Sequence, residues 1–161
     1  MKPADLVQLL REFYREKSAL YARHVAGARL VTGYNFNNAY QYVINREDVH
    51  LNWLRDAITD LGGTYEDAAE PAISATGKDA LAQIYRDDSR EMQAFMDRWK
   101  DRVERVTHAR NRTMLKLMLG EVLEQKRFFD QASAGQQDLL GRRADGMGTE
   151  GKVLSARWVG K

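Results

Sequence analysis

A glutamate and a histidine lie three residues apart in the stretch INREDVHLNWL, which covers residues 44–54. Side chains with this spacing point to the same side of a helix. Glu47 and His50 also fall in line with the apolar Leu51 and Leu54. The pair has the chemistry of a metal site, but it also has the chemistry of an ordinary buried hydrogen bond. An isolated E-x-x-H arises often by chance, so the choice depends on what the rest of the chain brings to it.

The other apolar-patterned segments each carry an acid on the same face as their apolar residues. These acids are Glu16, Glu91 and Glu121, and Glu121 is followed four residues later by Gln125. If the four segments are helices whose centres meet at one level, these side chains converge with Glu47 and His50. An unpaired carboxylate in an apolar core costs several kcal/mol. A divalent cation removes that penalty, and oxygen and imidazole ligands suit iron or manganese. The predicted metal ligands are therefore Glu16, Glu47, His50, Glu91 and Glu121.

Several alternatives stay open for these positions. Asp88 competes with Glu91, and Glu124 competes with Glu121. Glu16 has Lys17 and Arg23 nearby as surface ion-pair partners. A three-histidine site would use His24, His50 and His108, but His24 and His108 are expected near helix ends whereas His50 is central.

The elements that would position these residues are four long helices. The apolar periodicity predicts helices over residues 3–30, 36–61, 79–105 and 110–133, with no strand. Residues 62–78 are rich in glycine and small polar residues and read as a connection. A link of this length can travel the length of a bundle. The prediction is an all-α, antiparallel four-helix bundle with one long crossover between the second and third helices.

The domain organisation follows from the same pattern. Residues 1–133 form the bundle, and residues 134–161 form an irregular tail rich in glycine and basic residues. The tail is expected to dock through Val153, Leu154 and Trp158, or to contact a partner.

Composition limits the remaining function classes. The 161 residues contain no cysteine, which excludes disulfides and thiolate sites, and the net charge is only +2. There is neither a signal-peptide core nor an apolar run long enough to cross a bilayer, so a cytoplasmic protein without a membrane partner is expected. Basic residues concentrate between positions 98 and 116, but acids interrupt them, so a solvated helix end is favoured over a nucleic-acid interface.

At these residues the chain resembles the ferritin-like superfamily, which includes rubrerythrin-type proteins and ferritins. The resemblance covers about residues 4–133. Glu16, Glu47, His50 and Glu91 match the family pattern on the first three helices. The fourth helix lacks the second histidine of many members. Its Gln125 is similar to the glutamine that ferritins use there, so the resemblance implies Gln125 as a further metal ligand.

This resemblance implies a bundle that binds non-haem iron or manganese, as one or two ions, and reacts with oxygen or peroxide. It also implies an oxidoreductase or iron-handling role. Because the chain has no cysteine for an attached electron donor of the rubredoxin type, an external redox partner is expected, and a homo-oligomer is a further partner prediction. The rival hypothesis is a metal-free helical module that acts through oligomerisation or partner binding, and the missing histidine favours it.

Overall fold

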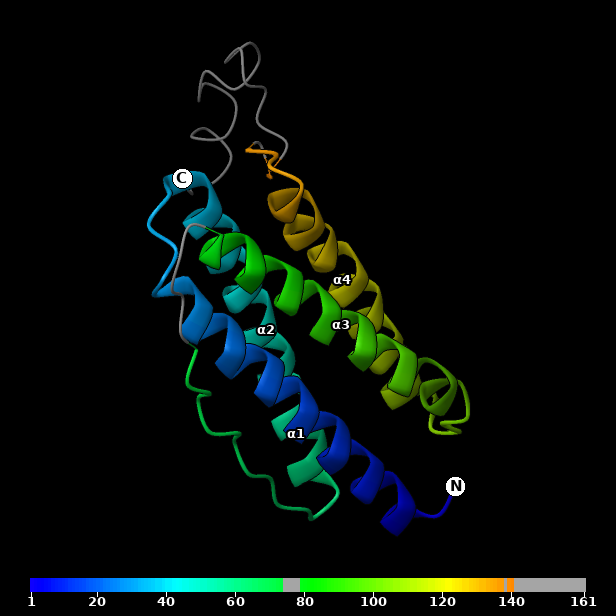
Figure 1. The fold of residues 1–161 in the computed structure, drawn as a ribbon. Coiled ribbons are helices and arrows are strands. Elements are labelled where there is room, and N and C mark those ends of the chain that lie inside the picture. The colour runs from blue at the N-terminus through cyan, green and yellow to red at the C-terminus, as the bar shows by residue number, and fades with distance from the viewer. Residues whose placement is uncertain (74–78, 138, 141–161) are drawn as a thin grey trace, which may run out of the picture.

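The structure is a computed structural model that describes residues 1–73, 79–137, 139 and 140. It contains four α-helices, labelled in Figure 1, and its described residues include no strand. The helices are α1 (Pro3–Ala28), α2 (Tyr34–Asp60), α3 (Ala80–Glu104) and α4 (Ala109–Ser133). The all-helical, four-helix prediction is confirmed, and the predicted helix ends agree with these bounds to within two residues. Within the predicted tail, Leu139 is buried, while Val153, Leu154 and Trp158 lie outside the described residues.

Local signals in the sequence set the helix ends. Pro3 occupies the first turn of α1, where its missing N–H costs nothing. His108 accepts a hydrogen bond at Nδ1 from the backbone N–H of Asn111 and so caps the start of α4. At the end of α2, Gly62 has φ +74°, and the N–H of Gly63 reaches back to the carbonyl of Ile58. This is the Schellman arrangement, in which a glycine takes the left-handed conformation that other residues avoid.

Side-chain contacts define two further helix seams besides the α1–α2 and α3–α4 pairs. Along the α1–α3 seam, Glu12 pairs with Arg102, and further along α1 Arg23 pairs with Asp88. Rising numbers on α1 meet falling numbers on α3, so these two helices are antiparallel. The α2–α4 seam is antiparallel in the same way, since Tyr42 contacts Phe128 and Arg46 pairs with Glu121.

The connection after α2 packs along α1 rather than extending into solvent (Figure 1). The hydroxyl of Tyr14 donates to the carboxylate of Asp67, and Arg55 Nε donates to the same hydroxyl at 2.8 Å. One residue further on, the backbone N–H of Ala68 donates to Ser18 Oγ at 2.6 Å. The described part of the link is therefore tied to α1 at the middle of that helix.

The core between α1 and α3 is aromatic. Phe13 makes edge-on contacts with Phe95 and Trp99, with ring centroids 5.1 and 4.8 Å apart. Such edge-on pairs add to the stabilisation that burial alone provides. None of the helices in the described residues is long and apolar enough to span a membrane.

Two glycines should respond to alanine in opposite directions. A Cβ at Gly63 would lie 2.8 Å from Val7 Cγ1 and 2.9 Å from Ile58 Cγ2, which is tighter than real contacts. Gly63→Ala should therefore lower the free energy of unfolding by about 1–3 kcal/mol. Gly120 lies exposed within α4, and a Cβ added there would have nothing within 4 Å. Gly120→Ala should therefore raise the free energy of unfolding by about 0.5–1 kcal/mol. Urea unfolding of both variants measures this, and equal effects would contradict the packing at Gly63.

Candidate functional site

Glu47 is the centre of a buried ionic cluster at mid-bundle. Its side chain is fully buried, and both of its carboxylate oxygens have partners from α1. Lys17 Nζ lies 2.5 Å from Oε1, and His24 Nδ1 lies 2.7 Å from Oε2. Since an ionised carboxylate can only accept, Nδ1 is the donor in the second bond. We call Lys17, His24 and Glu47 the Glu47 triad.

The triad holds Glu47 in its ionised form. Burial alone would raise the pKa of Glu47, but attraction to His24 and Lys17, together with their hydrogen bonds, holds this pKa at about 2. Lys17 and His24 are themselves fully buried. A buried lysine is rare unless it is paired, so the triad is a set of groups that can only be accommodated together.

His50 lies one helical turn beyond Glu47, also fully buried. Its Nε2 is 3.0 Å from Oε2 of Glu121, although the two groups are not aligned for a hydrogen bond. Glu121 is in turn held by Arg46, whose Nε donates to Oε2 at 2.9 Å. Burial and the nearby charge of Lys17 lower the pKa of His50 to about 4 against the opposing effect of Glu121. His50 is therefore a neutral imidazole at pH 7.

Further polar atoms gather around the triad without a hydrogen-bond partner among the described residues. They are Nε2 of His24, both ring nitrogens of His50, and both amide atoms of Gln125. Gln125 lies one turn from Glu121 and one turn from Phe129, whose ring stacks on His24 with centroids 5.0 Å apart. These atoms come from α1, α2 and α4, so the centre of the bundle is rich in groups that can donate or accept hydrogen bonds.

The structure divides the predicted ligands into two groups. Glu47, His50 and Gln125 are buried at the centre, and Glu121 contacts His50 from the α2–α4 seam. Glu16 instead accepts from Arg98 Nε at 2.9 Å and from Trp99 Nε1 at 3.0 Å on the α1–α3 seam.

Glu91 is outside the centre as well. Its side chain is 43% exposed, and its nearest cation is Arg90 at 3.8 Å. Asp88, the alternative on α3, is the buried carboxylate of that helix, and Arg23 and Tyr40 donate to its two oxygens. The preference for Glu91 as the inward acid of this helix is therefore corrected: one turn earlier in the helix, Asp88 shares the buried face of Met92 and Phe95.

Lys17 and His24 are the central residues that the sequence interpretation misplaced, Lys17 at the surface beside Glu16 and His24 near a helix end. Phe13, Lys17, Leu20 and His24 follow one another at steps of four, three and four, so they share one face of α1. The same periodicity that selects Glu47 on α2 thus selects Lys17 on α1. Lysine is normally a surface residue, so the residue type alone points away from the core.

The present arrangement does not fit a bound metal ion. Both oxygens of Glu47 are occupied by donors from α1, and Glu16 and Glu91 lie elsewhere. Within residues 1–73, 79–137, 139 and 140, no three His, Asp or Glu side chains are arranged to hold a metal ion.

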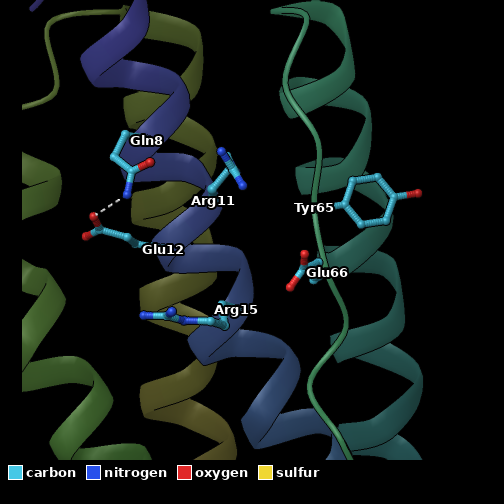
Figure 2. A pocket seen from close by; sticks show the side chains of 6 residues that line it. All are labelled: Gln8, Arg11, Glu12, Arg15, Tyr65 and Glu66. Atoms are coloured by element: carbon cyan, nitrogen blue, oxygen red, sulfur yellow. Dashed lines mark hydrogen bonds between the residues drawn. The ribbon is translucent and has the colours of Figure 1, made fainter.

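A surface pocket of about 120 Å³ lies between α1 and the link, apart from the triad. Figure 2 shows Gln8, Arg11, Glu12 and Arg15 along α1, beside the strip of chain that carries Tyr65 and Glu66. Gln8 Nε2 donates to Glu12 Oε1 at 2.9 Å. The pocket is small and mixed in charge, and it shares no residue with the central cluster.

Comparison with protein-family models, curated proteins and solved structures finds no match to this chain. The functional argument therefore rests on the site itself.

Acid should destabilise the protein in two separate pH ranges. His50 has a folded pKa of about 4, below its ordinary 6.5, so its contribution is complete above pH 6.5 and is lost as the pH falls toward 4. Glu47 has a folded pKa of about 2, below its ordinary 4.5, so its contribution is lost between pH 4.5 and 2. The Glu47 contribution is on the order of 3 kcal/mol.

Urea unfolding at a series of pH values measures both steps, and two variants separate them. His50→Gln should flatten the plot of unfolding free energy against pH between pH 6.5 and 4. The double variant Lys17→Met, Glu47→Leu removes the Lys17–Glu47 ion pair and should flatten the same curve below pH 4.5. A wild-type curve without slope between pH 6.5 and 4 would contradict the neutral state of His50.

Proposed function

We propose that this protein is a metal-independent helical bundle that acts by binding protein partners. The observation that carries the proposal is the pairing of both Glu47 oxygens with Lys17 and His24. Glu47 is the residue from which a metal centre would be built, and its charge is already balanced within the chain. The remaining acids are likewise balanced by side chains, Glu16 by Arg98 and Glu121 by Arg46.

We also propose that the bundle has the ferritin-like topology with one crossover. The antiparallel α1–α3 contacts, combined with a short α1–α2 connection, support parallel α2 and α3. Two parallel helices need a link that travels the length of the bundle. The packing of Asp67 and Ala68 along α1 supports such a path. A ferritin-like scaffold without its metal chemistry is consistent with both features.

The competing proposal is binding of iron or manganese followed by reaction with oxygen or peroxide. Its specific support is that His50, beside Glu121, and Gln125 are buried without hydrogen-bond partners for their ring nitrogens and amide atoms among the described residues. In that case the ion would have to displace the bonds that Lys17 and His24 make to Glu47. Electrons would then come from an external redox partner, because the chain has no cysteine for an attached thiolate centre.

Anaerobic titration of the metal-free protein with Fe(II), followed by elemental analysis, separates the two proposals. The expected result is substoichiometric iron in the wild type and no absorbance change on admitting air, because a second cation would face the ammonium of Lys17. Glu47→Gln serves as the matched control and should bind no less iron than the wild type. One or two tightly bound irons per chain, lost in Glu47→Gln, would instead establish the metal-binding function.

The α2–α4 seam is the surface that we propose for partner contact. It carries Tyr42 at 46% exposure, Trp53 at 37% and Leu117 at 49%. The Arg46–Glu121 pair sets the register, and it places Leu117 one turn from Glu121 in the direction of Trp53. Because this central ion pair is satisfied within the chain, a second copy can cover the seam without burying an unpaired charge from it. We therefore propose a second copy of the chain, related by a two-fold axis, as the partner.

Light scattering after size exclusion tests this assembly. The wild type should elute with the mass of two chains. Leu117→Glu should elute as one chain, because it places an unpaired charge among the exposed apolar side chains of the α2–α4 seam. Leu123→Glu is the matched control, since Leu123 is exposed on α4 but lies about 200° around the helix from Glu121. A wild-type mass of one chain at every concentration measured would reject the two-fold assembly.

A further inference from the structure

The core of this bundle contains its own cation. Lys17 is fully buried, and its ammonium lies 2.5 Å from the carboxylate that the centre of the bundle must neutralise. Lysine is almost never fully buried unless it is paired. The position of Lys17 therefore needs an explanation beyond the simple filling of space.

We propose that the Lys17 ammonium takes the place of a divalent cation and keeps the centre of the bundle closed to metal ions. This inference rests on the proposed metal-independent function and identifies the one residue responsible for it. It assigns Lys17 a selective role, because a lysine is a point charge that occupies one oxygen of Glu47 and repels any second cation.

Other side chains at the centre of the bundle are of the kinds that ligate metal ions. Glu47 and His50 come from α2 on adjacent turns, and Gln125 and Glu121 come from α4 on adjacent turns. The ring nitrogens of His50 and the amide of Gln125 have no hydrogen-bond partner among the described residues. Oxygen and imidazole groups of this kind suit Mn²⁺, Fe²⁺ or Co²⁺.

What separates this set from a metal site is the charge at position 17. A carboxylate at position 17 would replace the ammonium, which repels a cation, with a second acid facing Glu47. Two acids facing each other in a core repel one another, and a divalent ion between them relieves that repulsion. The substitution Lys17→Glu reverses the charge and shortens the side chain by one bond, which leaves space for an ion between positions 17 and 47.

The decisive experiment is Co(II) titration of four full-length proteins, followed by visible absorption and by the thermal midpoint. Wild type should bind Co(II) weakly. Lys17→Glu should bind it at least about 100-fold more tightly, with a ligand-field band and a rise in melting temperature on loading. Lys17→Met removes the ammonium without adding a ligand and should gain less than about tenfold. Lys17→Glu combined with Glu47→Gln should return to the wild-type affinity.

The outcomes distinguish this inference from the function on which it rests. Tight Co(II) binding by the wild type would reject both. Weak binding by the wild type together with weak binding by Lys17→Glu would reject only the role of Lys17. If Lys17→Glu is unfolded without metal, recovery of helical circular dichroism on adding Co(II) supports the inference. Failure to recover at any Co(II) concentration overturns it, because the ion would not be offsetting the added acid.

Discussion

The structure depends on neutralising one carboxylate in the middle of a helical bundle. Glu47 is fully buried, and an ionised group at that depth is tolerated only if each oxygen has a charged or hydrogen-bonded partner. Lys17 and His24 supply those partners from two turns of one helix. The triad therefore fixes which face of α1 meets α2, since rotating or sliding α1 by a turn would leave all three groups buried without partners.

The same arrangement explains why acids that look alike along the sequence behave differently. Glu16 directly precedes Lys17, so a rotation of about 100° sends the lysine into the core and the glutamate to the α1–α3 seam. There Glu16 is held by Arg98 and Trp99. Glu91 lies on the turn after the buried Asp88 and reaches solvent. Among the buried side chains, α2 and α3 contribute the carboxylates Glu47 and Asp88, whereas α1 contributes the cation Lys17 and α4 the neutral Gln125.

A resemblance in helix pattern therefore need not carry the chemistry with it. The E-x-x-H of α2, at Glu47 and His50, lies within a four-helix bundle. Lys17 and His24 balance its buried carboxylate, and the charges around such a carboxylate decide whether it binds a metal ion or pairs with a side chain. Function lies in the site rather than in the scaffold.

The sequence alone determined the four helices, because apolar periodicity, Pro3 and Gly62-Gly63 are local signals that act within a few residues. It also determined that Glu47 and His50 lie on the buried face of α2. Only the tertiary structure decided what those residues meet. Partner choice depends on the rotation and axial register of one helix against another, which many packed side chains set together. For that reason Lys17 rather than Glu16 faces Glu47, although the two are neighbours in the chain.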